Sequence, residues 1–342
     1  MAKTNDNLIE VNHLSVTFYN GKDENHAVED VTFRIKKGEV LGVVGESGSG
    51  KSVSAMSIMR LISYPPGKIT GGEIIFEGED VLKKTEEEMM KIRGNKISMI
   101  FQEPMTSFNP LYTIGSQIVE AIVLHQDKPK KEAEQMAVEL LHEVGISFPE
   151  KRVKEYPHQM SGGMLQRAMI AMALSCNPQL LIADEPTTAL DVTIQAQVLE
   201  LMKDLQSRLG TSIILITHDL GIVAEMADRI MIMYAGNIVE SGSCDDIFYN
   251  PSHPYTWGLL GSIPKEGQKN KEKLESIKGT PPDLHAEIKG CPFKHRCKYA
   301  MSVCHSYQPP AYDISEGHVS RCFLHHEMAP AVTNPVTKRE VK

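Results

Sequence analysis

The feature that most constrains this 342-residue chain is a glycine-rich loop between a strand and a helix. Val40–Val44 is an apolar run typical of a buried strand, and Gly-Glu-Ser-Gly-Ser-Gly-Lys-Ser follows it over Gly45–Ser52. A helix is predicted from about Lys51 to Ile62, because Pro65-Pro66-Gly67 ends the pattern. A strand, a G-x-x-x-x-G-K-S loop and a helix in this order indicate a phosphate-binding loop.

The residue types of this loop suit the phosphates of a nucleotide. Glycines let backbone N–H groups turn inward without a Cβ clash, and these groups favour anionic oxygens together with the helix N-terminus. Lys51 is expected to reach the β- and γ-phosphates, and the Ser52 hydroxyl to bind Mg²⁺. An ordinary glycine turn is the structural alternative. The residues expected to bind the nucleotide are Gly45, Glu46, Ser47, Gly48, Ser49, Gly50, Lys51, Ser52 and Val53.

Two acidic residues follow a second apolar run. Leu180–Ala183 predicts a buried strand, and Asp184 and Glu185 stand at its end. Because carboxylates near a core are costly without a cation, Asp184 is expected to hold Mg²⁺, directly or through water. Glu185 is expected to orient or deprotonate the water that attacks the γ-phosphate. A solvated strand end is the alternative.

Two neighbouring strands also end in polar side chains. Ser212–Thr217 is predicted to be a buried strand that leads to His218, and Ile97–Phe101 one that leads to Gln102. We expect His218 to contact the γ-phosphate and the attacking water, and Gln102 to reach Mg²⁺ or that water. A lone histidine after a strand is more often structural, but its place after the acidic strand favours the functional interpretation.

The remaining pattern predicts a parallel sheet covered by helices. Short alternating segments over residues 8–44, including separate strands at 8–11 and 14–18, are typical of β-structure. Residues 115–175 are mostly helical by pattern, and the apolar residues of Lys130–Val144 recur at helical spacing. Strand, helix and strand then alternate over residues 180–217, which indicates the α/β class.

The bulk properties exclude several classes of function. Lys and Arg total 36 against 44 Asp and Glu, and this acidic balance argues against nucleic acid as the main partner. The polar start, Met1–Asn7, shows no secretory signal, and no apolar stretch approaches the about 18–20 residues of a membrane-spanning helix. We expect a soluble or peripheral chain that serves a membrane only through a partner.

Taken with further motifs, these residues resemble the nucleotide-binding subunit of ATP-binding cassette (ABC) transporters over roughly residues 8–260. Met160 stands where the family usually has leucine in its signature motif. The matching motifs are Walker A (Gly45–Ser52), the Q-loop (Gln102), the signature motif (Met160–Arg167), Walker B (Leu180–Glu185), the D-loop (Ala189–Asp191) and the switch histidine (His218).

The resemblance implies both the fold and the way the site closes. The implied fold is an α/β P-loop ATPase with a RecA-like parallel-sheet core, an N-terminal antiparallel β-subdomain, a helical signature subdomain over about 103–178 and a small Cys-rich C-terminal extension. Phe18 is expected to stack on adenine, with Tyr19 as the alternative. ATP would be sandwiched between two chains and contacted in trans by Ser161, Gly162, Gly163 and Gln166.

Three segments are similar to the ATPases of di- and oligopeptide importers: Gly45–Ser52, Gln102–Pro110 and His253–Thr256. The closest similarity is to their "D" type, which typically pairs with a distinct "F" subunit. Relatives of this architecture import nickel chelates or glutathione, so the cargo stays open. A soluble ABC ATPase of DNA repair or translation and an iron–sulfur sensor module are the other classes considered.

This subgroup also implies a location and a set of partners. The chain would hydrolyse MgATP on the cytoplasmic face of the cell membrane, beside a paralogous ATPase or a second copy of itself. The other implied partners are two membrane permease subunits and an extracytoplasmic peptide-binding protein. Gln102 and its loop would touch a coupling helix of a permease subunit.

Four of the six cysteines crowd into one C-terminal stretch as Cys291, Cys297, Cys304 and Cys322. Four thiolates suit Zn²⁺ or an iron–sulfur cluster, and their spacing does not choose between the two. The surrounding residues resemble the peptide-permease extension, which implies a [4Fe–4S] cluster of structural or regulatory role. Free thiols in a small core are the third alternative. Alternative ligands are His295, His305 and His318.

Changes in composition divide the chain into three parts. We expect an ABC nucleotide-binding domain over residues 1–262 and an oligopeptide-permease-type extension with the four-cysteine site over 263–328. A stretch rich in Lys, Glu and Gln over 265–278 predicts a solvated linker. The polar residues 329–342 predict a disordered tail.

Overall fold

The computed structural model describes residues 6–188, 190–263, 277–286 and 288–341, so most of the predicted linker lies outside the described residues. The chain divides into two compact units. The first unit comprises residues 1–9, 34–40 and 75–217, and the second unit comprises residues 10–33, 41–74 and 218–342.

The first unit is built on three parallel strands, β6 (Ile97–Ile100), β7 (Leu180–Asp184) and β8 (Ser212–Thr217), which pair in the order β6-β7-β8. Every residue of the three strands is buried. Continuous apolar runs are expected of parallel strands that are covered on both faces. The three strands predicted at these positions are therefore confirmed to within one residue.

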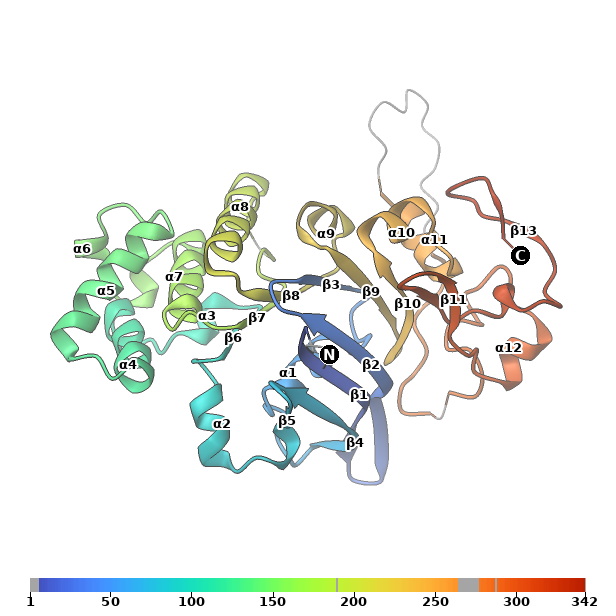
Figure 1. The fold of residues 1–342 in the computed structure, drawn as a ribbon, viewed down its shortest axis with the longest axis horizontal. Helices are drawn as coiled ribbons and strands as arrows, with labels where there is room; N and C mark the ends of the chain where they lie inside the picture. Colours follow the sequence, from blue (N-terminus) through green and yellow to red (C-terminus); the bar gives the residue numbers. More distant parts are fainter. Residues whose placement is uncertain (1–5, 189, 264–276, 287, 342) are drawn as a thin grey trace, which may run out of the picture. The chain divides into compact units, whose positions relative to one another are not determined.

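Most of the rest of the first unit is helical, and several of its helices gather in the green part of Figure 1. The helix α4 (Ile114–Gln126) packs on α5 (Lys130–Glu143) and on α7 (Gly162–Leu174), and α5 also contacts α6 (Pro149–Arg152). Thr113 caps α4 by accepting a hydrogen bond from the Ser116 N–H. The predicted helical region over 115–175 and the helix predicted from Lys130 are confirmed.

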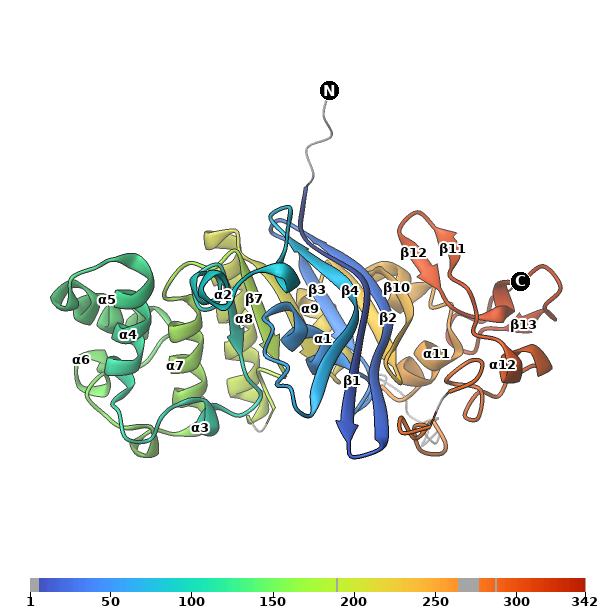
Figure 2. The same ribbon diagram turned by 90° about the horizontal axis from the view of Figure 1, so that it is seen from below.

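The antiparallel strands β1 (Asn7–Asn20), β2 (Asp23–Lys36) and β4 (Gly67–Phe76) lie mostly in the second unit, side by side in the order β2-β1-β4 (Figure 2). The sequence predicts a break in β1 near Asn12-His13, but the strand runs through it. His13 takes a left-handed φ of 53°, and its N–H donates to the Thr32 hydroxyl at 2.9 Å. This side-chain bond keeps the irregular residue attached to the neighbouring strand.

The second unit also contains a mixed sheet. Leu41–Val44 of β3 (Val40–Val44) pairs in parallel with β9 (Arg229–Tyr234). The strands β10 (Asn237–Ser243), β12 (His318–Ser320) and β11 (Tyr312–Ser315) continue it in antiparallel pairs. The last two strands belong to the C-terminal extension, so the extension is joined to the rest of the unit by main-chain hydrogen bonds.

The remaining elements are short apart from the 18-residue helix α8 (Val192–Leu209). In the first unit they are β5 (Glu79–Asp80), α2 (Glu86–Ile92), α3 (Pro104–Ser107), α8 and the 3-10 helices Val81–Lys83 and Pro157–Gln159. In the second unit they are α1 (Lys51–Ile58), α9 (Leu220–Met226), α10 (Cys244–Tyr249), α11 (Pro254–Gly261), α12 (Ser302–Ser306), β13 (Val332–Thr333), β14 (Glu340–Val341) and the 3-10 helix Phe323–His325. Among the described residues no helix combines the length and apolar character needed to cross a membrane.

The C-terminal tail differs from the prediction of disorder. β13 and β14 pair as a small antiparallel ladder. Asn334, between these strands, is 2% exposed, and its side-chain amide donates to the Pro251 carbonyl at 2.8 Å. The Arg339 guanidinium also donates to the Asn250 side chain at 3.0 Å. Polar anchors of this kind hold a segment whose composition offers little apolar surface.

Candidate nucleotide-binding site

The glycine-rich loop Gly45–Ser52 joins β3 to α1 within the second unit. A Cβ atom on Gly45 would lie 2.2 Å from the Met233 carbonyl oxygen, so no larger residue fits there. Gly48 and Gly50 adopt left-handed φ angles of 77° and 96°. Glycine adopts such angles without the steric cost that other residues carry, which explains its recurrence in the loop.

Lys51 and Ser49 give this loop the chemistry of an anion site. The ammonium group of Lys51 lies against the loop, where Nζ donates to the carbonyls of Gly45 (2.8 Å) and Glu46 (3.0 Å). The Ser49 hydroxyl is buried and has no hydrogen-bond partner among the described residues. A cation and a buried unsatisfied hydroxyl in a glycine loop fit an anionic ligand such as phosphate.

The predicted acidic residues lie at the end of β7 in the first unit. Asp184 is 7% exposed, and Glu185 follows it with a left-handed φ of 48°, which is uncommon for a residue with a side chain. The Glu185 carboxylate accepts hydrogen bonds from the Gln102 amide (3.0 Å) and the Thr188 hydroxyl (2.9 Å). The structure thus brings Gln102 and Glu185 together, and it adds Thr188, which the sequence analysis missed.

The residues predicted to hold Mg²⁺ share one chemical property. Ser52, Gln102 and Asp184 each offer a side-chain oxygen. Mg²⁺ prefers oxygen ligands and usually keeps several waters when it binds beside nucleotide phosphates. The donor set therefore fits this ion.

The signature residues form the start of α7 in the first unit. Ser161 is the N-cap, and its hydroxyl accepts from the Met164 N–H at 3.3 Å. Ser161 and Gly162 are exposed, and Gly163 is half-buried. Gln166 differs from these three because it is only 2% exposed and its side-chain nitrogen lacks a hydrogen-bond partner among the described residues.

The other predicted site residues of the second unit remain predictions. His218 is exposed and stands two residues before α9. Phe18 is half-buried, and its ring lies against Gly67, where an added Cβ would come within 2.7 Å of it. Tyr19 donates its backbone N–H to the Pro66 carbonyl at 2.8 Å. Either aromatic ring is near enough to the surface to meet a base.

The D-loop is described only in part. Ala189 lies outside the described residues. Asp191 is the N-cap of α8, where its carboxylate accepts from the Ile194 N–H at 3.0 Å. Val53, predicted to bind nucleotide, is half-buried in the first turn of α1.

The predicted iron–sulfur site is wrong, and the zinc alternative fails with it. In the part of the chain that the structure describes, no three Cys, His, Asp or Glu side chains are arranged to hold a metal ion. Cys291 and Cys304 instead belong to an apolar core with Phe293. Burial raises the pKa of Cys291 to about 11 and that of Cys297 to about 12, and it raises the pKa of Cys322 as well. Protonated thiols of this kind behave as small apolar side chains.

The alternative histidine ligands have other partners. His318 is 1% exposed, and its Nε2 lies 2.8 Å from the carboxylate of Glu240, which is equally buried. His295 and His305 face each other edge to face, with ring centroids 5.9 Å apart. These contacts connect the extension internally and to β10, so the histidines serve its packing.

Two polar contacts at the phosphate loop have no signal in the sequence. The Glu46 carboxylate forms a two-pronged ion pair with the Arg296 guanidinium, at 2.6 and 3.0 Å. The Glu46 N–H donates to the Tyr255 hydroxyl at 3.0 Å. In the sequence, Tyr255 stands out only as part of His253–Thr256, and Arg296 only as a neighbour of Cys297.

Comparison with known proteins gives the chain its family. Residues 28–188 match the family described as ABC transporter, and residues 239–304 match the C-terminal region of the oligopeptide/dipeptide transporter. The oligopeptide transport ATP-binding protein OppD of Bacillus subtilis (strain 168) is 54% identical over 328 residues, or 96% of this chain and 92% of that relative. The dipeptide transport ATP-binding protein DppD of the same organism is 51% identical over 93% of this chain and 94% of its own length.

Solved structures agree with this assignment. The ATP-binding cassette MJ0796, solved as a dimer in a post-hydrolysis state bound to ADP and Pi, is 28% identical with a TM-score of 0.63. The similarity covers 69% of this chain and 98% of that one. The cbiO1 protein of Clostridium perfringens, part of the ABC transporter complex cbiONQ, has a TM-score of 0.61 and 27% identity over 72% of this chain and 92% of its own. The chain therefore belongs to the ABC transporter family, as an ATP-hydrolysing subunit whose C-terminal region is of the oligopeptide/dipeptide type.

Proposed function

We propose that this chain hydrolyses ATP to drive the import of oligopeptides or dipeptides. The observation that carries the proposal is the presence in one chain of an ABC ATPase and an oligopeptide/dipeptide transporter C-terminal region. Identity of 54% to a relative named for oligopeptide transport extends over both parts. A soluble ABC ATPase without a transport role is not expected to contain the oligopeptide/dipeptide transporter C-terminal region.

The phosphate loop would bind ATP in the second unit. Backbone N–H groups of Gly45–Ser52 would surround the phosphates, and Lys51 would exchange its carbonyl partners for phosphate oxygens. Phe18 or Tyr19 would stack on adenine. Ser52, Gln102 and Asp184 would hold Mg²⁺, which when bound neutralises charge on the phosphates.

Glu185 would act on the water that attacks the γ-phosphate. The water oxygen forms a bond to phosphorus while the bond to the β–γ bridging oxygen breaks, and Glu185 takes up a proton from the water. Gln102 and Thr188 already donate to this carboxylate, so its position is fixed from two sides. His218 would contact the γ-phosphate and the same water.

The site would be completed by a second ATPase subunit. The exposed N-terminus of α7 would present Ser161, Gly162 and Gly163 to nucleotide on the partner subunit, with Gln166 behind them. The partner is a paralogous ATPase or a second copy of this chain. Two membrane permease subunits and an extracytoplasmic peptide-binding protein complete the importer, with this chain on the cytoplasmic face. We assign the ATPase domain to residues 1–262 and the extension to 263–328.

The Glu185→Gln variant tests this function. The amide cannot take a proton from water, so ATP hydrolysis should fall by a factor of about 10² to 10⁴. ATP binding should persist, and ATP should then trap a closed dimer, with a second copy or with the paired subunit, in size-exclusion chromatography. Hydrolysis at the wild-type rate would rule out the role given to Glu185.

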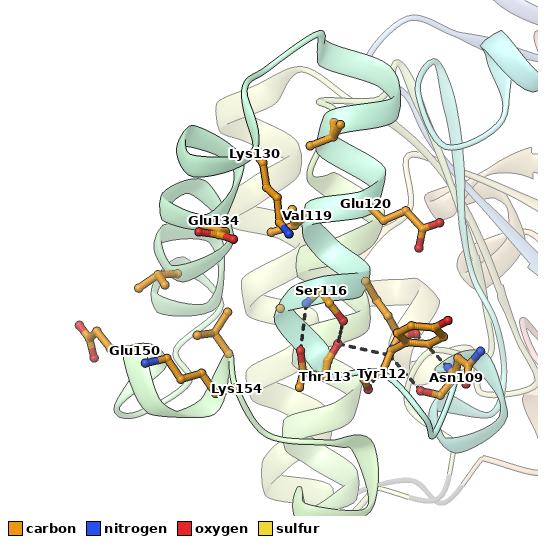
Figure 3. Close-up of a pocket in the computed structure, with 15 residues that line it drawn as sticks. Asn109, Tyr112, Thr113, Ser116, Val119, Glu120, Lys130, Glu134, Glu150 and Lys154 are labelled. Atoms are coloured by element: carbon orange, nitrogen blue, oxygen red, sulfur yellow. Dashed lines mark hydrogen bonds between the residues drawn. The ribbon is translucent and has the colours of Figure 1, made fainter.

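A groove in the first unit suits a helix of the permease. Its volume is about 1050 Å³, and it lies between α4, α5 and the segment around Glu150 and Lys154 (Figure 3). Tyr112 and Val123 line it and are 58% and 41% exposed. Charged side chains of both signs surround these apolar groups, including Lys130. An apolar floor with a charged rim fits a short amphipathic helix.

We propose that this groove binds the cytoplasmic coupling helix of a permease subunit. Val123→Glu should abolish co-purification with the permease subunits, while ATP hydrolysis by this chain together with its paired ATPase subunit stays within about twofold of wild type. Met90→Glu is the matched control, because Met90 is 58% exposed but lies on α2, outside the groove. Equal assembly of both variants would exclude the groove as the docking site.

A further inference from the structure

The strongest unexplained contact in the second unit links the C-terminal extension to the phosphate loop. Arg296 and Glu46 stand 250 residues apart in sequence, and their two-pronged pair is mostly buried, with side-chain exposures of 6% and 28%. Paired parallel hydrogen bonds between guanidinium and carboxylate fix direction as well as distance. The pair therefore constrains the orientation of the Glu46 side chain.

Arg296 is itself held firmly in place. Its Nε donates to the Lys278 carbonyl at 3.1 Å, and Nη1 donates to the Tyr234 hydroxyl at 3.3 Å. The guanidinium carbon lies 5.7 Å from the centre of the Tyr234 ring, within the range of a cation–π contact. A side chain anchored to the extension and to β9 at once can serve as a fixed point for the loop.

The main chain of Glu46 connects this fixed point to the phosphate-binding lysine. The Glu46 N–H donates to Tyr255, and the Glu46 carbonyl accepts from Lys51 Nζ at 3.0 Å. Glu46 thus contacts Arg296 through its side chain and Lys51 through its backbone carbonyl. If the loss of Arg296 lets the main chain rotate at Glu46, the Glu46 carbonyl that accepts from Lys51 Nζ would move as well.

A second stretch of the extension lies against the same loop. Pro281, Pro282 and Leu284 line a cavity of about 140 Å³ together with Glu46–Ser49. The Leu284 carbonyl also accepts a hydrogen bond from the His26 N–H at 3.2 Å. The extension therefore contacts the phosphate loop at two places, so the contact does not depend on one side chain alone.

We propose that Arg296 is a positioning residue for ATP, which holds the phosphate loop in its binding conformation through Glu46. The C-terminal extension is then part of the nucleotide site, and its attachment sets the ATP affinity of this chain. This inference rests on the proposed ATP site at Gly45–Ser52. It assigns Arg296 no contact with ATP and no part in proton transfer.

The test is a double-mutant cycle on the full chain, with the dissociation constant of ATP, kcat and KM as readouts. Arg296→Met should weaken ATP binding about tenfold, equivalent to about 1.4 kcal/mol, and raise KM in parallel while kcat changes less than about twofold. Glu46→Gln should have a similar effect, and the double variant should be no weaker than either single one. Arg296→Lys should recover part of the affinity, because lysine keeps the charge but not the two-pronged geometry.

Two control variants accompany the cycle. Arg321→Met removes another arginine of the extension, whose side chain has no hydrogen bond or ion pair in the described part of the chain, and should leave ATP affinity unchanged. Lys51→Ala tests the ATP site itself: normal ATP binding by this variant would refute the proposed function.

Loss of binding in Lys51→Ala together with wild-type affinity in Arg296→Met would overturn only the inference. The inference would also be overturned if the loss of ATP affinity in the double variant equalled the product of the losses in Arg296→Met and Glu46→Gln. If Arg296→Met fails to fold, the KM values of Arg296→Lys and Glu46→Gln test the positioning role instead. Wild-type KM in both would then contradict the positioning role, and a raised KM in both would support it.

Discussion

The buried carboxylate of Glu240 gives a sharp prediction for stability. Glu240 is 1% exposed in β10, and its oxygens accept hydrogen bonds from the backbone N–H groups of Ser252 (2.6 Å) and His253 (2.9 Å). The Thr256 hydroxyl donates to it as well, and His318 Nε2 lies 2.8 Å away. One side chain thus joins β10 to α11 and to the extension strand β12.

Replacing Glu240 with leucine removes every one of these acceptors. The Thr256 hydroxyl can rotate toward another partner, but the two buried peptide N–H groups cannot, and each costs about 1–3 kcal/mol when left unsatisfied. Left unsatisfied together, the two N–H groups cost about 2–6 kcal/mol. We therefore expect Glu240→Leu to lower the free energy of unfolding of this region by about 2–6 kcal/mol.

Urea unfolding followed by tryptophan fluorescence measures this change. Trp257 is the one tryptophan of the chain; it is 2% exposed in α11, and its indole N–H donates to the Pro251 carbonyl at 2.7 Å. Glu316→Leu is the matched control, because Glu316 is exposed between β11 and β12, and it should change stability by less than about 0.5 kcal/mol. Equal unfolding curves for Glu240→Leu and wild type would refute this reasoning.

Three further predictions concern pH, packing and catalysis. Burial lowers the pKa of His253 to about 3, so the unfolded chain takes up a proton below about pH 6.5 and stability should fall as pH drops from there, by up to about 1.4 kcal/mol per unit. His253→Asn keeps an N-cap acceptor for α11 and should flatten this slope in urea titrations; an unchanged slope would exclude His253 as its source. A Cβ on Gly115 would lie 2.2 Å from a Val153 methyl, so Gly115→Ala should cost about 1–3 kcal/mol in thermal unfolding, and an unaltered transition would contradict the packing. Thr188→Ala removes a hydrogen bond to Glu185 and should lower kcat by up to about tenfold at unchanged KM, whereas a wild-type kcat would count against that contact.

The sequence predicted best those elements whose signals are local. The predicted strand Val40–Val44 is β3, and the helix predicted over Lys130–Val144 is observed with its end one residue earlier. Both were predictable because the spacing of apolar residues and the preferences of glycine act over a few neighbouring residues. Gln102 and Glu185 were each expected to follow a buried strand, and the parallel pairing of β6 with β7 brings their side chains to 3.0 Å, a contact that was not predicted. The functional roles of these residues stay predictions.

Long-range polar contacts could not be predicted in this way. Nothing near Glu46 or Arg296 marks them as partners, because a pair separated by 250 residues leaves no periodic pattern. The iron–sulfur prediction failed for a related reason: it rested on the similarity of the surrounding residues to the peptide-permease extension, and that similarity does not show that Cys291 and Cys304 are buried beside Phe293 in an apolar core. Such outcomes depend on tertiary packing.

The central claim is that ATP is bound and hydrolysed at the Gly45–Ser52 loop. Phosphate release by the purified full chain, alone and with its paired ATPase subunit, tests it most directly when wild type is compared with Lys51→Met. Lys68→Met is the control, since Lys68 is exposed in β4. We predict that Lys51→Met lowers the rate at least about 100-fold while Lys68→Met hydrolyses ATP like wild type. Equal rates for Lys51→Met and wild type would contradict the claim.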